Sequence, residues 1–260
     1  MTDLGRSTII AELGLHTAAD GPVVRGRVAI VPEVCAPGTT MVRTSVLATW
    51  ADIVTGFVAG QTVNPRVPLT LDLEVQLQSG AHAGDRVVVD ATAVKVGRTV
   101  IVCEARFVDE LAGTPVAVAH ASFIASPDPD HVFAGGFPGP TMLGGRLTVP
   151  LAERIGARTI APGCVEVPHR PDGLNASGGI QGGLVAFAAE EAVLSLAADA
   201  SVLEALNVRY LRQFSVGPAQ AVAERHDGMA IVHLTDAGAG RLCAIASARL
   251  GRASRPDQQT

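Results

Sequence analysis

The sequence predicts an α+β fold that is built twice, each half being a long apolar helix wrapped by an antiparallel β-sheet. Two internal matches indicate the duplication. Residues 108–123 align without gaps to residues 235–250 with six identical positions, and both copies alternate around a turn as a β-hairpin does. Residues 46–52 align to residues 184–190 in two helix-like segments, and each segment ends on a carboxylate. Because the two matches occur in the same order along the chain, a repeated unit explains them better than chance does.

The first half reads in order as a strand, a helix and an antiparallel meander. Residues 22–31 are largely apolar and β-branched, and residues 32–40 form a turn that opens on proline. Residues 44–60 carry the helix, which ends before the proline-rich residues 64–68 because proline cannot continue it. Alternating apolar and polar residues then predict strands at residues 69–78, 85–96, 99–108 and 116–125.

The second half repeats this order after a linker rich in proline and glycine. Its turn lies at residues 168–175 and its helix at residues 182–198. Its strands are predicted at residues 206–214, 220–225, 230–235 and 241–250. The resulting organisation is a first unit, a linker, a second unit and a disordered tail, at residues 1–125, 126–145, 146–252 and 253–260.

One stretch at the second helix carries the clearest functional signal. Residues 175–183 read Asn-Ala-Ser-Gly-Gly-Ile-Gln-Gly-Gly and lead without a break into the helix. The glycines let a ligand approach the backbone, and the first turn of a helix offers unpaired N–H groups to a carbonyl oxygen. Glu190 lies in an otherwise apolar part of the helix, where a carboxylate is costly unless it has a partner or a function. A carbonyl-binding site is therefore predicted, and a glycine-rich loop before a core helix is the alternative.

Composition excludes several function classes. The chain has 260 residues and a net charge of −5, so neither a nucleic-acid partner nor an anionic membrane surface is expected. No basic and apolar leader opens the chain and no apolar run reaches the length of a membrane span, which predicts a cytoplasmic protein. The seven histidines show no metal-ligand spacing, so no metal site is expected. Residues 176–178, Ala-Ser-Gly, match the serine-nucleophile elbow only in part, which makes a Ser–His–Asp triad a minor alternative.

Both halves resemble the hotdog fold, and residues 22–250 resemble the double-hotdog acyl-CoA thioesterases of the phenylacetate-pathway (PaaI-like) kind. That family enters its helix through Asn-x-x-Gly-x-x-His-Gly-Gly and carries an Asp or Glu nine residues after the His. The chain fits this spacing at Asn175, Gly178 and Glu190, with Gln181 where the His is usual. The resemblance implies a tandem (double) hotdog fold, each unit a long central helix wrapped by an antiparallel β-sheet.

The resemblance also implies which residues form the site. In the family the turn of one hotdog faces the carboxylate of its partner, so Asp52 would face the glycine-rich turn of the second half. The thioester oxygen would accept hydrogen bonds from the Gly182 N–H and from a side-chain amide, and Asp52 would act as general base or nucleophile. The candidate catalytic residues are thus Asp52, Asn175, Gln181, Gly182 and Glu190, and the candidate substrate-binding residues are Gly183, Arg43 and Thr44.

The first half departs from the family's pattern at the corresponding turn. Residues 43–45 read Arg-Thr-Ser where His-Gly-Gly is usual, and the asparagine is also missing. Arg43 is expected to pair with Glu190 instead and to hold the pKa of that carboxyl down, which would leave this second site inactive.

The predicted function is hydrolysis of an acyl-CoA thioester to the free acid and CoA, with no cofactor beyond the CoA of the substrate. Two alternatives stay open. One is a catalytically silent acyl-CoA-binding protein; the other, less favoured because no His–Asp pair lies at the helix entrance, is an enoyl-CoA hydratase or dehydratase. Association into a dimer or trimer of double hotdogs is expected, with neither nucleic acid nor a membrane as a partner.

Overall fold

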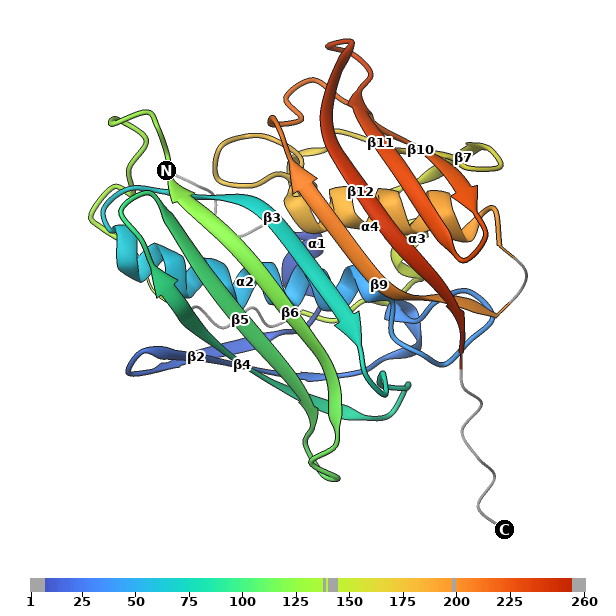
Figure 1. Cartoon of the computed structure of the whole chain (residues 1–260), viewed down its shortest axis with the longest axis horizontal. Coiled ribbons are helices and arrows are strands. Elements are labelled where there is room, and N and C mark those ends of the chain that lie inside the picture. Colours follow the sequence, from blue (N-terminus) through green and yellow to red (C-terminus); the bar gives the residue numbers. More distant parts are fainter. Residues whose placement is uncertain (1–7, 138, 140–144, 198–199, 254–260) are drawn as a thin grey trace.

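A computed structural model describes residues 8–137, 139, 145–197 and 200–253 of the chain. The strands form one 12-stranded sheet in the order β1-β2-β4-β5-β6-β3-β9-β12-β11-β10-β8-β7. Every neighbouring pair is antiparallel. Two long helices lie against one face of this sheet, one behind each half (Figure 1). The predicted α+β class and the tandem arrangement of two helix-and-sheet units are confirmed.

The first half follows the predicted order closely. Its central helix α2 (Thr44–Val63) begins at the predicted residue and runs three residues past the predicted end. The sheet around it also contains a short strand, β1, that was not predicted. The strands are β1 (His16–Asp20), β2 (Val23–Ala29), β3 (Pro68–Leu77), β4 (Arg86–Val96), β5 (Val100–Asp109) and β6 (Pro115–Ala125). Two short helices, α1 (Ile9–Glu12) and η1 (Pro32–Val34), precede α2.

The second half has the same order with shorter outer strands. Its helix α4 (Gly182–Leu194) begins where predicted and ends four residues before the predicted end. The strands are β7 (Arg158–Ala161), β8 (Cys164–Val167), β9 (Ser201–Tyr210), β10 (Ala219–His226), β11 (Met229–Asp236) and β12 (Arg241–Arg252). Short helices α3 (Leu151–Ile155) and η2 (Pro171–Gly173) lie before α4. The β5–β6 and β11–β12 hairpins are the repeated segment that the sequence indicated.

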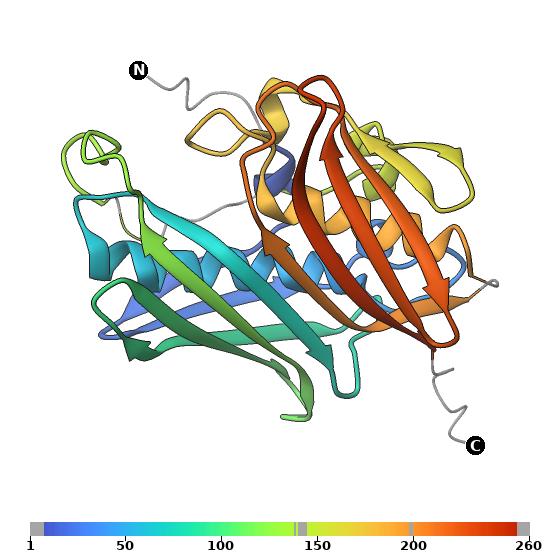
Figure 2. The same cartoon turned by 45° about the horizontal axis from the view of Figure 1, so that its top comes forward.

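The two halves are joined at the centre of the sheet and at the helices. β3 pairs with β9 over the register from Asp72↔Arg209 to Gln76↔Ala205, so neither strand is left as a free edge. Both views show these two strands side by side, in cyan and orange (Figures 1 and 2). The start of each helix contacts the middle of the other, since Thr44 bonds to Glu190 and Gln181 to Asp52. The helices therefore run antiparallel.

Helix α2 is long and apolar enough to cross a membrane, contrary to the expectation that no segment is. It is the one helix among the described residues that meets this description by length and composition, and 61% of its most apolar window is buried inside the protein. The strands β2 to β6 and helix α4 cover it, which accounts for its apolar composition: it is the core of the first half.

The beginning of the predicted linker packs against the end of α2 and the start of β3. The Ser126 N–H donates to the Val67 carbonyl at 2.9 Å, and the Val67 N–H donates to the His131 carbonyl at 3.1 Å. Phe137 donates its backbone N–H to the Asn64 side chain at 2.8 Å. This part of the linker is therefore fixed close to the start of β3.

Candidate active site between the two halves

Asp52 lies in the middle of α2 and is partly exposed. Its Oδ1 accepts a hydrogen bond of 2.9 Å from the Thr70 hydroxyl on β3, and its Oδ2 accepts one of 3.3 Å from the Gln181 amide. One bond thus comes from each half of the chain. The two donors fix the orientation of the carboxylate without covering it.

The N-terminus of α4 faces this carboxylate. Gln181 is the N-cap residue, and its side-chain oxygen accepts from the Gly183 N–H while its amide nitrogen donates to Asp52. Within the described part of the chain the Gly182 N–H has no hydrogen-bond partner. A Cβ on Gly182 would lie 3.5 Å from Asp52 Oδ2, so these groups border the same space. The site therefore combines a carboxylate with a free N–H at the positive end of a helix.

Burial raises the pKa of Asp52 to about 6, although the hydrogen bond from Thr70 opposes this shift. At neutral pH the carboxyl is ionised but more basic than an ordinary aspartate. This is the range in which a carboxylate works well as a general base.

Tyr210 on β9 completes the surroundings of Gly182. Its hydroxyl donates to the Gly182 carbonyl at 3.0 Å, and burial together with the nearby Asp52 charge raises its pKa well above the ordinary value. Tyr210 therefore stays neutral and holds the first turn of α4. Neither Tyr210 nor Thr70 was predicted as a site residue. Tyr210 could have been noticed because it is the only tyrosine in the chain.

Asn175 organises the glycine-rich turn. Its side-chain oxygen accepts from the Ser177 and Gly179 N–H groups at 3.0 and 3.1 Å, as in an Asx turn. Asn175 is exposed, and no hydrogen bond joins it to Asp52 or Gln181 among the described residues. Of the two side-chain amides considered from the sequence, the structure brings only that of Gln181 to Asp52.

Gly183 lies at the crossing of the two helices. A Cβ at this position would be 2.6 Å from Thr49 Cγ2 on α2, so the space is already filled by Thr49. Gly183 is buried, and its N–H is used by the N-cap. The substrate-binding role predicted for Gly183 gains no support from this geometry, which gives it a packing role.

Replacing Gly183 by alanine should separate the helices where they cross. We expect Gly183→Ala to lower the free energy of unfolding by about 1–3 kcal/mol, the usual range for overpacking. Thr49→Ala in the same chain should recover part of this loss because it removes two of the three clashing atoms. Denaturant unfolding of the two single variants and the double variant measures this coupling. If the losses simply add, the two residues do not compete for this space.

The corresponding turn of the first half is closed by the carboxylate that faces it, Glu190 on α4 of the second half. Glu190 Oε1 accepts from the Thr44 N–H at 2.9 Å, the equivalent of the free Gly182 N–H, and Oε2 accepts from the Ser45 hydroxyl. The Thr44 hydroxyl in turn donates to the Leu203 carbonyl. Glu190 is fully buried. Thr44 and Glu190 therefore satisfy each other, and this turn offers no free N–H at the position where Gly182 does.

Arg43 pairs with two carboxylates beside this closed turn. Its guanidinium lies 2.7 Å from Glu191 Oε2 and 3.6 Å from Glu190 Oε2, and it stacks over the Phe187 ring at 5.0 Å. The pairing with Glu190 is confirmed, but Glu191 is the nearer partner. The expected lowering of the Glu190 pKa is wrong: burial raises it, and the opposing effect of Arg43 is smaller.

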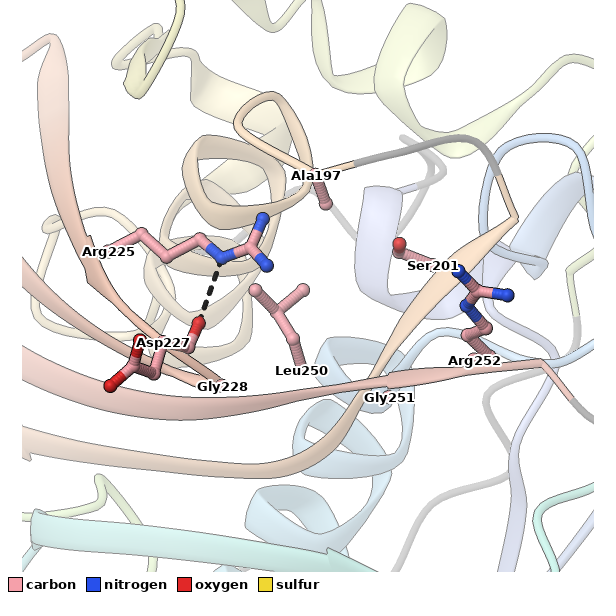
Figure 3. Close-up of a pocket in the computed structure, with 8 residues that line it drawn as sticks. All are labelled: Ala197, Ser201, Arg225, Asp227, Gly228, Leu250, Gly251 and Arg252. Carbon is pink, nitrogen blue, oxygen red and sulfur yellow. Dashed lines mark hydrogen bonds between the residues drawn. The ribbon is translucent and has the colours of Figure 1, made fainter.

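Two cavities of about 300 Å³ lie elsewhere, and none of the eight candidate residues lines either of them. One lies past the end of α4, with Arg225 and Arg252 on its walls (Figure 3). Arg225 donates to the carbonyls of Asp227 and Leu196 at 3.0 and 3.4 Å. Because Leu196 lies just after α4 and Asp227 lies between β10 and β11, this arginine links the segment that follows the helix to that turn.

Comparisons with known proteins agree with this architecture. Residues 42–116 match the family model of the Thioesterase superfamily, and no curated protein matches the sequence. The 12:0-ACP thioesterase from Umbellularia californica superposes with a TM-score of 0.63 at 11% identity, covering 90% of this chain and 99% of that one. An acyl-ACP thioesterase from Bacteroides thetaiotaomicron gives a TM-score of 0.61 at 12% identity, covering 88% and 98%. The chain has the double-hotdog fold, and its resemblance to double-hotdog thioesterases is confirmed.

Proposed function

We propose that the chain hydrolyses acyl thioesters at the composite site formed by Asp52 and the N-terminus of α4. The observation that carries this proposal is the partly exposed carboxylate of raised pKa beside a helix N-terminus whose Gly182 N–H is free. The match of residues 42–116 to the Thioesterase superfamily supports the same reaction class.

In the proposed reaction the thioester oxygen accepts a hydrogen bond from the Gly182 N–H, where the helix dipole stabilises the negative charge that develops. Asp52 takes a proton from water as the water oxygen attacks the carbonyl carbon, and the proton then passes to the leaving sulfur as the C–S bond breaks. Direct attack by Asp52, giving an anhydride that water cleaves, uses the same geometry. Gln181 and Thr70 orient the carboxylate in both routes.

Acyl-CoA is the proposed substrate, and CoA enters only as part of it. Two of the similar structures are acyl-ACP thioesterases, so an acyl group carried on the thiol of an acyl carrier protein is the second possible substrate. Incubation with acyl-CoAs and with acyl carrier proteins of matched chain length, followed by a thiol-reactive dye, tests both. Release of free thiol from one carrier class identifies it, and no release from either refutes the proposal.

A silent acyl-CoA-binding protein is the second candidate, and one observation favours it. The family's usual His is Gln181 here, and both ends of its amide are already bonded, to Gly183 and to Asp52. A saturable calorimetric signal with acyl-CoA, without thiol release, would identify this function. A hydratase stays the least favoured, because Asp52 bonds to Thr70 and Gln181 and to no histidine among the described residues.

Activity should depend on the ionisation of Asp52. Because its pKa is raised to about 6 by burial, kcat/KM should fall about tenfold per unit below pH 6 and be flat above pH 7. Thr70→Ala removes the hydrogen bond that favours the ionised form, so the acid limb should move to higher pH. Rate measurements from pH 5 to 9 on both proteins test this. An acid limb that Thr70→Ala leaves in place would argue against Asp52 as the titrating group.

We propose that the protein is cytoplasmic and assembles as a dimer or trimer of double hotdogs. Exposed apolar side chains on the second half of the sheet support such assembly; they are Val222, Met229, Ile231 and Leu242.

A further inference from the structure

A chain of hydrogen bonds joins the glycine-rich turn to the linker. Ser177 Oγ lies 3.1 Å from His131 Nε2, and His131 Nδ1 lies 3.1 Å from Ser126 Oγ. Ser126 is 2% exposed, so the far end of this chain is anchored inside the protein. We refer to Ser177, His131 and Ser126 as the clasp.

The clasp connects the two parts of the candidate site. Ser126 and His131 both bond through their backbones to Val67, which directly precedes β3, and β3 carries the Thr70 that holds Asp52. At its other end Ser177 belongs to the turn that leads to Gly182. Among the described residues, only the Ser177–His131 and Gln181–Asp52 bonds join a side chain of the first 145 residues to residues 174–183.

Other bonds to the turn come from its own half. His169 Nε2 lies 3.0 Å from the Gly178 carbonyl, and the Gln213 amide donates to the Ser177 carbonyl at 2.7 Å. These contacts shape the turn on the second half, but they do not set its position relative to Asp52. The clasp is therefore placed to do so.

The surroundings of Ser177 do not suit a nucleophile. The N–H groups of Ser177 and Gly179 both donate to the Asn175 side chain, and the Gly178 N–H donates to the Asn175 carbonyl, so none is free for an oxyanion. Within the part of the chain that the structure describes, the second nitrogen of His131 meets a hydroxyl and no carboxylate. The pair thus lacks both the oxyanion donors and the acidic partner of a catalytic serine triad.

We propose that His131 is a positioning residue, which through Ser177 holds the Gly182 turn in register with Asp52. This inference rests on the proposed hydrolysis at that site. Small displacements of reacting groups cost rate far more than affinity when binding contacts are kept. Loss of the clasp should therefore lower kcat and leave KM nearly unchanged.

Kinetics of His131 and Ser177 variants test the positioning role. His131→Ala and Ser177→Ala should each lower kcat by about tenfold or more, and the double variant should lose no more than either single one, because both remove the same bond. His131→Gln places an amide near the former Nε2 and should recover part of the loss. His131→Asn places it near Nδ1 and should recover none. Equal kcat for wild type and Ser177→Ala overturns the proposal.

A matched control comes from another His–hydroxyl pair, in which the Thr40 hydroxyl lies 2.9 Å from His82 Nδ1. Thr40→Ala removes a similar bond away from residues 174–183 and should leave kcat unchanged. A loss of kcat equal to that of Ser177→Ala would overturn the specific role of the clasp.

Hydrogen exchange gives a readout that does not need turnover. The amides of residues 174–183 should exchange faster in Ser177→Ala than in the wild type, and unchanged exchange overturns the clasp even if the wild type is inactive. An inactive wild type with faster exchange in the variant refutes the proposed function alone. Labelling of Ser177 by a fluorophosphonate that disappears in His131→Ala would overturn the positioning role in favour of a nucleophile.

Discussion

Asp52→Asn should lower the rate of thioester hydrolysis by about 10²- to 10⁴-fold, the contribution expected of a general base. The expected loss is in kcat, because asparagine keeps the shape of the side chain and cannot accept a proton from water. The fold should survive: the new amide can place its oxygen toward Gln181 and its nitrogen toward the Thr70 hydroxyl, which can accept as well as donate. Thiol release at pH 8 and circular dichroism measure the two effects.

The same substitution should make the protein more stable at pH 8. The folded-state pKa of Asp52, about 6, is above the ordinary value of 3.8, so the stability that protonation provides at low pH is lost as pH rises through 6. Asparagine has no such dependence. A higher thermal midpoint with lost activity would show that the carboxylate is kept for function at some expense of stability. A variant that loses both activity and fold would not support the assignment.

Glu190→Gln should have the opposite pattern, leaving most activity and lowering the free energy of unfolding by about 1–3 kcal/mol. Glu190 is fully buried and accepts from the Thr44 N–H and the Ser45 hydroxyl, beside Arg43. The glutamine oxygen can accept from the Thr44 N–H and its amide nitrogen can donate to the Ser45 hydroxyl, but the new side chain carries no charge, so the buried Arg43 loses one of the two carboxylates that it pairs with. Urea unfolding and thiol release are the two measurements.

Glu204→Gln is the control for the loss of a carboxylate that pairs with arginine. Glu204 lies 3.3 Å from Arg249 with both side chains about half exposed, so its removal should change stability by less than about 0.5 kcal/mol. If Glu190→Gln abolished hydrolysis while Asp52→Asn kept it, the active site would belong to the other pair of turn and carboxylate.

The duplicated fold could be predicted because it follows from the internal repeat, whereas the pairing of Asp52 with the Gly182 turn was what the resemblance to the double-hotdog thioesterases implied. Each carboxylate is the ninth residue of its helix, and the two helices start 138 residues apart. This regularity survives in the sequence even where the side chains have changed. The alternation of strands and the proline that ends α2 are equally local signals.

The parts that were not predicted depend on contacts between segments distant in the sequence. The pKa of Glu190 depends on how completely other elements bury it, and Arg43 alone suggested the wrong direction. Thr70 and His131 reach the site only because β3 and the linker meet near α2. The role of Gly183 depends on Thr49, a residue of the opposite helix. Contacts between such distant residues produce no periodicity or spacing in the sequence from which they could be predicted.

One polypeptide contains both turns and both carboxylates, and the pairing of β3 with β9 joins the two halves that hold them. In a pair of identical subunits every substitution in a turn would occur twice and alter both sites at once. Here a substitution occurs once, so Thr44 and Arg43 can close one turn while Gly182 and Gln181 keep the other open. In a single chain the two turns can therefore change independently, so that one turn forms a buried contact between the helices while the other keeps a free N–H group.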